Sequence, residues 1–449
     1  MRKKIFIFTS LTLSILIFLA LWNVVSGGYD RQNKIILLLK KIIPSSVSHK
    51  VRDTVFIIPD LKEENKILNL QVQKYEQGMQ GKKFKDTIVV SDKKKTKFNL
   101  KEFFLPFPRL DLRLGWAATE NSRRAHYLEI VKDKVLVISG LGQTIFFEKQ
   151  NIFKDKLLQK EIPNNIIEIL KENEAELIGI RDLFIEENKV YISLQHKNQK
   201  GFTINIYQSD LSFEKLKFEL FFETKEYWPT YNVFSGGRIE TFKKNKILFS
   251  IGFANVKNAA QNKKSLLGKI IAIDKYSKNY EIISMGNRNP QGLFYVKKHD
   301  LVVNTEHGPK GGDEINFNYL NFGEIPNYGW DIASYGTTYD DEKIYKNSHS
   351  KFGFVEPFKY YTPSIGISEI VYLPKAIVFD KKETLFVSSL RAASIYIIKM
   401  SDKLDKIIEE DRLYFVEQRL RHIEYDKEND VFFIIFENTP SIGVLKIKI

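Results

Sequence analysis

A glycine-rich segment of the chain places acidic side chains beside a backbone that must turn sharply. Gly308–Pro309 and Gly311–Gly312 come directly before Asp313 and Glu314. Glycine and proline at these positions favour a tight, irregular loop whose carbonyl oxygens can point inward. Mixed carbonyl and carboxylate oxygens are the ligands that Ca²⁺ accepts. The segment is therefore a candidate calcium loop, and the alternative interpretation is a plain turn with solvated acids.

Three phrases around this loop carry a family resemblance. They are Arg288-Asn-Pro-Gln-Gly-Leu293, Glu306-His-Gly-Pro-Lys-Gly-Gly-Asp-Glu-Ile-Asn316 and Asn327-Tyr-Gly-Trp330. In this order and spacing they resemble the soluble glucose and aldose sugar dehydrogenases, which use pyrroloquinoline quinone (PQQ). The resemblance extends from about Gly236 to Leu445, and none is seen before about residue 120.

The resemblance implies an active centre in which arginines hold an acidic quinone. Arg288 and Asn289 match the pair that reaches the active centre in the family, and Asn289 also counts among the quinone contacts. Arg391, Arg419 and Arg421 match the basic positions that hold the quinone. PQQ carries three carboxylates, and clustered guanidinium groups are suitable receptors for carboxylates.

The resemblance also assigns positions to calcium. Gly308 and Pro309 correspond to residues whose carbonyls bind the Ca²⁺ that touches the quinone. Asp313, Glu314 and Tyr328 correspond to a structural calcium region nearby. The expected cofactors are therefore PQQ and Ca²⁺.

Two departures from the family pattern bear on turnover. Phe234 stands where the family has its catalytic base, a histidine two residues before the Gly-Gly-Arg phrase. Phe253 stands where the family has the aspartate that orients this histidine. A hydrocarbon ring cannot accept a proton, so base and orienter are predicted to be lost together. His307, inside the second phrase, is a candidate base or a contact to the quinone.

Recurring pairs of apolar strands must position these residues. An apolar strand, a charged or asparagine-containing turn and a second β-branched or aromatic strand recur from residue 126 onward. Six such hairpins begin at Tyr127, Leu183, Arg238, Leu293, Ala376 and His422. Most of the turns lie roughly 47–57 residues apart, which predicts an all-β, six-bladed β-propeller. The spacing between the fourth and fifth turns rises to roughly 80 residues, where binding loops are expected. Two packed sheets are the alternative.

The N-terminus reads as a membrane anchor. Three basic residues precede an apolar run from Ile5 to about Val25, which is long enough to cross a bilayer. No Ala-x-Ala cleavage motif follows this run, so an uncleaved anchor is favoured over a cleaved signal peptide. We expect an anchor helix at residues 1–28, a lysine-rich stalk and linker at 29–105, and the propeller at 106–449. The expected location is the bacterial inner membrane, with a single pass and the propeller in the periplasm.

Composition limits the classes of function. The formal net charge is +14, but the lysines are scattered as pairs in predicted turns, which argues against a nucleic-acid partner. The chain has no cysteine, which excludes disulfides, thiolate metal sites and cysteine nucleophiles.

Two hypotheses of function follow. The first is a quinoprotein that oxidises an aldose or related alcohol at the carbon bearing the hydroxyl and passes a hydride to PQQ, with Ca²⁺ polarising the quinone; the sequence does not identify the final electron acceptor. The second is a non-catalytic propeller that binds a sugar, a glycan or a protein partner. A lactonase-like hydrolase is a weaker third option, because nothing in the sequence selects it.

Overall fold

The structure is a computed structural model that describes residues 85–92, 97–107, 125–320, 323–339, 345–377, 381–415, 418–438 and 440–446. The predicted anchor and most of the predicted linker lie outside these residues. None of the helices within the described ranges is long and apolar enough to span a bilayer. Membrane attachment therefore stays a prediction.

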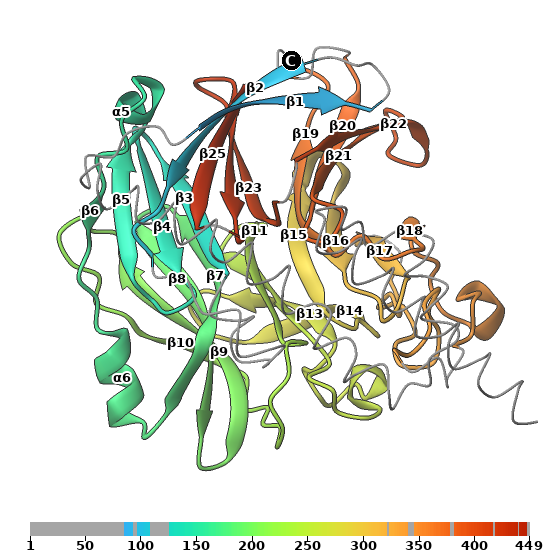
Figure 1. Cartoon of the computed structure of the whole chain (residues 1–449). Coiled ribbons are helices and arrows are strands. Elements are labelled where there is room, and N and C mark those ends of the chain that lie inside the picture. The colour runs from blue at the N-terminus through green and yellow to red at the C-terminus, as the bar shows by residue number, and fades with distance from the viewer. Residues whose placement is uncertain are drawn as a thin grey trace, which may run out of the picture. The chain divides into compact units, whose positions relative to one another are not determined.

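The strands form six antiparallel blades around a central axis (Figure 1). The first blade contains β3 (His126–Val131), β4 (Lys134–Ser139), β5 (Thr144–Glu148) and β6 (Lys160–Glu161). The second contains β7 (Glu176–Glu186), β8 (Lys189–Asn198), β9 (Gly201–Asp210) and β10 (Glu219–Glu223). The third contains β11 (Gly236–Phe242), β12 (Lys246–Ile251), β13 (Lys269–Asp274) and β14 (Tyr280–Met285). The fourth contains β15 (Pro290–Val296), β16 (Leu301–Glu306), β17 (Asp313–Tyr319) and β18 (Lys359–Tyr361).

The last two blades share one hydrogen-bonded sheet. The fifth blade contains β19 (Ile367–Leu373), β20 (Glu383–Ser389), β21 (Ser394–Met400) and β22 (Ile407–Tyr414). The sixth contains β23 (Leu420–Asp426), β24 (Val431–Phe436) and β25 (Ser441–Lys446). The innermost strands β3, β7, β11, β15, β19 and β23 contact one another in sequence, and β23 returns to β3. The predicted six-bladed propeller is confirmed.

The N-terminal strands close the ring. Strand β2 (Lys97–Phe104) pairs along the whole of β25 and completes the sixth blade. Strand β1 (Lys85–Ser91) pairs with β2 and, through Val90 and Ser91, with β22 of the fifth blade. The sequence prediction put these residues in the linker, whereas the structure places Lys85–Ser91 and Lys97–Phe104 in strands of the sheet. Pairing of β2 with β25 and of β1 with β22 covers strand edges where the ring closes, which explains why the sixth blade takes its outer strand from the part of the chain before the first blade.

The fifth predicted hairpin began at the wrong strand. The strand that pairs with β20 is Ile367–Leu373 and not the segment starting at Ala376, of which Ala376 and Ile377 lie in a turn after Pro374. Ser368 and Glu369 interrupt the apolar pattern of β19, and both are buried. A strand next to the central channel can hold polar side chains when they find partners there, so its sequence lacks the apolar alternation that marks a surface strand.

A long insertion separates β17 from β18, as the spacing between the fourth and fifth hairpins predicted. Its described parts, residues 323–339 and 345–358, contain one short 3-10 helix, η4 (Ser350–Phe352). Helices elsewhere in the described chain are short: α5 (Lys149–Phe153), α6 (Ile166–Glu172), η2 (Ala259–Gln261) and η3 (Lys297–His299).

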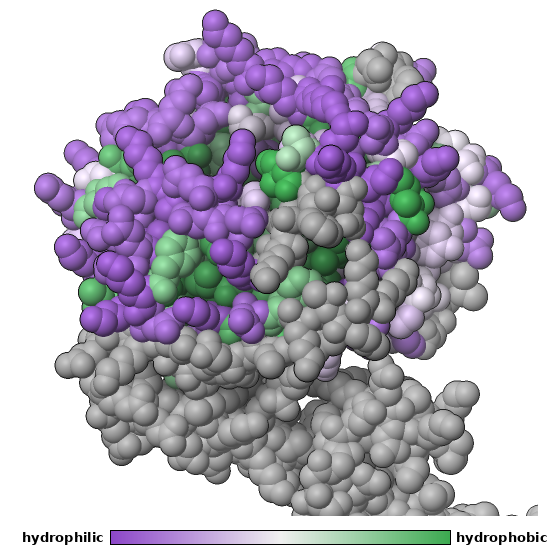
Figure 2. All heavy atoms as spheres, turned by 90° about the horizontal axis from the view of Figure 1, so that it is seen from above, coloured by the Kyte–Doolittle hydropathy of each residue, from purple (hydrophilic) through white to green (hydrophobic). Residues whose placement is uncertain are grey.

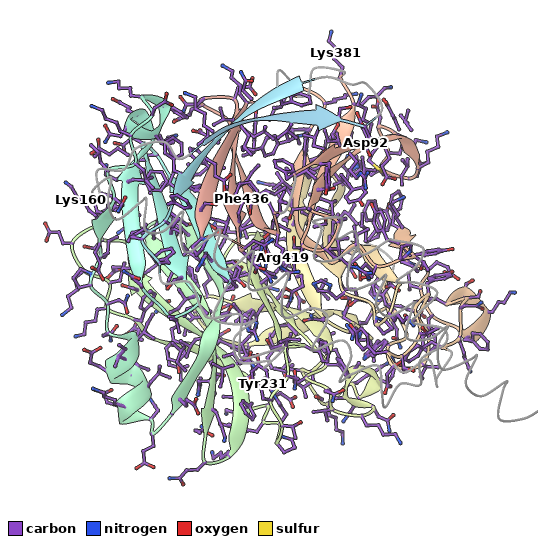
Figure 3. All side chains as sticks on the ribbon, viewed as in Figure 1. Asp92, Lys160, Tyr231, Lys381, Arg419 and Phe436 are labelled. Atoms are coloured by element: carbon purple, nitrogen blue, oxygen red, sulfur yellow. The ribbon has the colours of Figure 1, made fainter. Side chains whose placement is uncertain are left out.

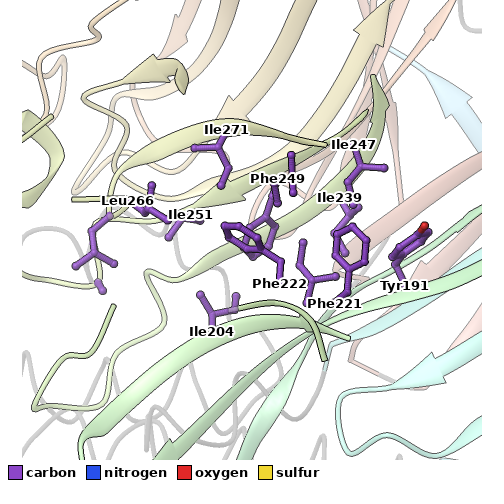
Figure 4. Close-up of a cluster of buried hydrophobic side chains, with 14 of the residues drawn as sticks. Tyr191, Ile204, Phe221, Phe222, Ile239, Ile247, Phe249, Ile251, Leu266 and Ile271 are labelled. Carbon is purple, nitrogen blue, oxygen red and sulfur yellow. The ribbon is translucent and has the colours of Figure 1, made fainter. Parts of the chain in front are cut away.

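Apolar side chains fill the spaces between neighbouring blades. Figure 4 shows the contact between the second and third blades, where Tyr191, Phe221 and Phe222 face Ile239 and Phe249. β-Branched and aromatic residues fit such a pleated surface, and middle strands covered on both faces become apolar throughout. The described surface on the side of β1 and β2 is largely hydrophilic (Figure 2).

Candidate functional site

The loops that enter the innermost strands meet at one end of the central channel. All six blades begin with their innermost strand and continue antiparallel, so the starts of these strands lie at the same end. Phe234 precedes β11, Arg288 precedes β15, and Arg419 precedes β23. His307 follows β16, whose end lies beside the start of β15. Arg419 lies near the middle of the ring of blades (Figure 3).

Glycines allow two of these loops to touch backbone to backbone. A Cβ on Gly252 would lie 2.1 Å from the carbonyl oxygen of Phe234, so no other residue fits there without a shift. The amide of Ala254 donates to the same oxygen at 3.0 Å. This close approach brings Phe253 to Phe234.

Phe234 and Phe253 form an aromatic stack instead of a polar pair. Their ring centroids are 5.5 Å apart at an interplanar angle of 27°. Phe253 also packs edge-on against Trp330 at 5.2 Å, and Trp330 contacts Tyr345 at 5.0 Å. Trp330 and Tyr345 belong to the long insertion, which thus supplies one wall of the site. Phe253 is buried, whereas Phe234 is partly exposed.

Arg288 lies within this aromatic group. Its guanidinium carbon is 4.4 Å from the ring centroid of Phe234 and 5.1 Å from that of Trp330, which are cation–π distances. The Nη1 atom donates to the His307 carbonyl at 2.9 Å. Its backbone amide donates to Glu306 at 2.8 Å. Burial lowers the pKa of Arg288, but a guanidinium stays charged in proteins. The site therefore holds a fixed cation against aromatic rings.

Asn289 links the third and fourth blades at the channel end. Its Oδ1 accepts hydrogen bonds from the Gly236 amide at 3.2 Å and from Gln291 Nε2 at 3.2 Å. The side-chain oxygen of Gln291 accepts from Arg421 Nη1 at 2.8 Å. A polar chain thus joins Asn289 to the arginines of the sixth blade.

Arg419 and Arg421 share one buried acid. Arg419 Nε lies 3.1 Å from Glu437 Oε2, and Arg421 Nε lies 2.5 Å from Glu437 Oε1. Although burial opposes the charged form, the two guanidinium groups lower the pKa of Glu437 to about 2. The side chain of Arg419 is 37% exposed and that of Arg421 is 11% exposed. Arg391 is exposed on the loop that contacts Gly366.

His307 lies among the same charges. Burial, together with the nearby Arg421, Arg288 and Arg419, lowers the pKa of His307 to about 4, although Asp313 opposes the shift. The imidazole is therefore neutral at pH 7 and 20% exposed. A neutral imidazole can donate or accept a hydrogen bond, but with this pKa it binds a proton weakly.

Asp313 holds the glycine-rich loop in place. Its carboxylate accepts hydrogen bonds from the Gly308 amide at 3.0 Å, from Ser364 Oγ at 2.6 Å and from the Ile367 amide at 3.0 Å. A Cβ on Gly308 would lie 2.2 Å from the carbonyl oxygen of Gly312. The loop is as tight as the sequence predicted, and its carbonyls gather close to Gly308. The protein itself satisfies the Asp313 carboxylate.

A second, fully buried acid pair lies beside the loop. Glu306 and Glu314 are both paired with the side-chain amide of Asn316, at 3.4 and 3.3 Å. Burial raises the pKa of Glu306 to about 7, and burial together with Glu306 raises the pKa of Glu314 well above its ordinary value. The Asn316 side-chain oxygen is buried without a hydrogen-bond partner. Tyr328 is buried nearby, and its hydroxyl donates to the Phe317 carbonyl at 3.0 Å.

Oxygen donors thus exist here, but acids are few. No group of three or more histidine, cysteine or acidic side chains that could hold a metal occurs among the residues placed by the structure. A cation at this position needs backbone or amide oxygens beside the two carboxylates, which is a set that Ca²⁺ accepts.

Sequence reasoning missed Arg181 and Gln195. Arg181 lies at an irregularity in the middle of β7, the innermost strand of the second blade, and its Nε donates to Gln195 Oε1 at 2.8 Å. Ser235, next to Phe234, donates to the same oxygen at 3.2 Å. The sequence did contain a signal, because Arg181 and Asp182 are charged residues within an otherwise apolar strand. Arg238 and Arg421 are likewise charged residues on innermost strands.

Comparisons with known proteins agree on the family. The family description Glucose / Sorbosone dehydrogenase matches residues 151–442. An uncharacterised Synechocystis protein is 27% identical over 289 residues, which are 59% of this chain and 68% of that protein. The aldose sugar dehydrogenase YliI of Escherichia coli is 27% identical over 226 residues, which are 46% of this chain and 58% of that enzyme. The chain thus spans less than two thirds of the latter.

Solved structures share the fold. A glucose dehydrogenase crystal structure is 18% identical with a TM-score of 0.62, covering 73% of this chain and 98% of that one. The PQQ-bound aldose sugar dehydrogenase of Streptomyces coelicolor is 18% identical with a TM-score of 0.52, covering 71% and 92%. The family match includes the second to fifth blades, the long insertion and the arginines of the sixth blade, so the chain belongs to the Glucose / Sorbosone dehydrogenase family.

Proposed function

We propose that the chain is a PQQ-binding, sugar-dehydrogenase-like protein of low turnover, in which Phe234 and Phe253 replace the base and its orienter. The observation that carries this proposal is the aromatic stack at 5.5 Å within cation–π distance of Arg288, at the channel end where Arg419 and Arg421 lie. The arginines that could bind an acidic quinone are present, but the two phenylalanine rings beside them cannot accept a proton.

The cationic side of the site suits an acidic quinone. Arg288, Arg419 and Arg421 contribute three guanidinium groups, and Glu437 balances only part of this charge. Exposed Arg391 adds a further cation at the rim. The carboxylates of PQQ would complete the charge balance, because guanidinium and carboxylate groups pair in a bidentate geometry. Asn289 and His307 would contact the quinone through neutral polar groups. When bound, PQQ supplies the two-electron acceptor.

The proton-accepting side of the site is weak. Neither phenylalanine can accept the proton of a sugar hydroxyl, and removal of a general base typically slows a reaction by about 10²–10⁴-fold. His307 lies among Arg288, Arg419 and Arg421, but its pKa of about 4 gives it little affinity for a proton at pH 7. We assign it to quinone contact and not to proton abstraction.

Calcium is proposed with a revised set of ligands. The carbonyls of Gly308 and Pro309 remain the donors on the quinone side. In the structural region we propose Glu306 beside Glu314, in place of Asp313, because hydrogen bonds from the protein satisfy the Asp313 carboxylate. The Asn316 side-chain oxygen, buried without a partner, and the Tyr328 hydroxyl complete the candidate donors.

A second candidate function is non-catalytic binding of a sugar, a glycan or a protein partner. The partly exposed ring of Phe234, stacked on Phe253, favours it because aromatic faces present a rigid apolar surface to a ligand. This candidate keeps the fold and abandons the electron transfer.

The test is reconstitution of the purified protein with PQQ and Ca²⁺. We expect a saturable change of the quinone absorbance, together with slow reduction of a redox dye by aldoses. Quinone binding with rapid dye reduction would refute the loss of the base. A protein that binds sugar but gives no absorbance change with PQQ would instead be the non-catalytic binder. Export to the periplasm and the N-terminal anchor remain part of the proposal, and fractionation of expressing cells tests them.

A further inference from the structure

Arg181 is a buried cation whose partners are neutral. Its exposed fraction is 7%. The Nε and Nη2 atoms both donate to the single amide oxygen of Gln195, and the hydroxyl of Tyr231 is a further neutral partner. This edge of a guanidinium is the fork that usually receives both oxygens of a carboxylate. An amide oxygen takes that place here.

The adjacent acid serves a different arginine. Asp182 follows Arg181 in the chain, but its carboxylate pairs with Arg238 Nη1 and accepts from the Ile239 amide at 2.7 Å. Arg238 also pairs with Glu369. No ion pair within the described ranges includes Arg181, so one arginine of the channel has two acids and its neighbour has none.

A like-charged neighbour adds to the imbalance. Burial lowers the pKa of Arg181 most, Tyr231 and Tyr127 partly oppose this shift, and the like-charged Arg421 lowers the pKa further. A buried ion that lacks a counter-ion is unfavourable, and such sites persist where a ligand supplies the opposite charge. The surplus therefore indicates an anionic ligand at this end of the channel.

Arg181 lies on the Phe234 side of the site. Gln195, which it holds, also accepts from Ser235 and reaches the Asn232 carbonyl at 3.4 Å, so Arg181 supports the loop that carries Phe234. A Cβ on Gly237 would lie 2.3 Å from the Arg181 Cβ, so glycine at this position allows the Arg181 side chain to pack directly against the backbone of residue 237. Arg181 belongs to the second blade, whereas Arg419 and Arg421 lie at the start of the sixth.

We propose that Arg181 binds an oxyanion carried by the sugar, so that the ligand of this protein is an anionic sugar and not a neutral aldose. The inference rests on the proposed function, because it places the sugar on the Phe234 side and the quinone against Arg419 and Arg421. Carboxylates and phosphates share the chemistry that a guanidinium recognises. The two sources are separated by the choice of probe.

The test is isothermal titration of the whole protein, loaded with PQQ and Ca²⁺, with three probes: glucuronate, glucose 6-phosphate and glucose. We expect one of the two anions to bind about ten- to a hundredfold more tightly than glucose, the range that one charge-assisted hydrogen bond provides. Arg181→Gln should abolish this preference, and Arg181→Lys should retain part of it. Arg412→Gln is the matched control, since Arg412 pairs with Asp92 on the outer strands, and it should keep the full preference.

Other outcomes overturn the assignment. Equal affinity for glucose and both anions in the wild type refutes it. If Arg181→Gln weakens PQQ binding as much as Arg421→Gln does, Arg181 is a quinone residue. If Arg181→Gln lowers the melting temperature more than Arg412→Gln does, its role is structural. Repeating the titrations without PQQ separates the two proposals: an anion preference that persists in a protein unable to bind PQQ refutes the quinone proposal and supports the role of Arg181.

Discussion

On the proposed function, introducing a base at position 234 and its orienter at position 253 together should increase turnover. In Phe234→His, the introduced imidazole would lie about as far from Arg288 as the present ring, whose centroid is 4.4 Å from the guanidinium carbon. At an effective dielectric constant of about 20, a unit charge at this distance disfavours the imidazolium by roughly 4 kcal/mol, which is about three pKa units. The single variant is therefore expected to hold a weak base, much as His307 does, and to gain less than about tenfold in rate.

Phe253→Asp supplies the missing opposite charge. The two rings are 5.5 Å apart. At this separation a carboxylate returns roughly 3 kcal/mol, or about two pKa units, to the imidazolium. Arg288 lies 6.0 Å from the Phe253 ring and favours the ionised carboxylate. The double variant should therefore reduce dye about 10²-fold faster than the wild type, a gain larger than the product of the single variants.

Stability limits this experiment and provides its control. Removing Phe253 from its contact with Trp330 is expected to destabilise the fold by about 3–5 kcal/mol, offset in part by Arg288. Melting curves must show that each variant is folded before rates are compared. The control is Phe234→Gln with Phe253→Asn, which opens the same space without a base. An equal gain in the control assigns the effect to access. No gain in a folded double variant that binds PQQ would show that Phe234 does not occupy the base position.

Three further predictions follow from individual contacts. Calcium should raise the melting temperature of the wild type by binding the native state, and Glu314→Gln should reduce this rise; no shift at millimolar calcium would mean that the loop is only a turn. Arg421→Gln should weaken PQQ binding about tenfold or more, whereas Arg412→Gln should leave it unchanged; equal affinities would remove Arg421 from the quinone site. Burial lowers the pKa of His196 to about 4 in the folded protein. As pH falls from about 6.5 towards 4, the unfolded chain therefore protonates this histidine more readily than the folded protein does, and the free energy of unfolding decreases. The variant His196→Gln retains a partner for Asn205 but cannot bind this proton. The change in the free energy of unfolding caused by the substitution should therefore be more favourable at pH 5 than at pH 8 by roughly 2 kcal/mol, which denaturant titrations at both pH values test.

The repeating hairpins made the propeller predictable from the sequence, whereas strand β2, which closes the ring, could not be predicted. Five hairpins were predicted in the right place because their strands are rich in β-branched and aromatic residues at a regular spacing. Strand β2 lies outside the period, and its partner β25 is more than 300 residues away in the chain, as the Asn99 and Lys446 pairing shows. Long-range pairing of this kind leaves no local signal. Strand β19 was missed because channel-lining Ser368 and Glu369 break its apolar pattern.

The site was predictable where residues are local and not where partners are distant. The phrases from Arg288 to Trp330 identified the loop and its glycines, and the structure brings Arg288 and His307 close to Arg419 and Arg421. Glu437 and Arg181 were missed because their roles depend on contacts with residues in another strand or loop, which the local sequence does not show. Likewise, nothing in the sequence shows that Ser364 and Ile367 donate to Asp313, the observation for which we propose Glu306 in its place as a calcium ligand.

The central claim, a quinone site that lacks its base, is tested most directly by anaerobic rapid mixing. Wild-type protein loaded with PQQ and Ca²⁺ is mixed with excess aldose or the corresponding anionic sugar, and the absorbance of the bound quinone is followed. We predict a spectrum of bound PQQ that persists, with reduction about 10²-fold slower than in the Phe234→His, Phe253→Asp double variant. Complete reduction of the bound quinone by the wild type, as fast as by the double variant, would contradict the account.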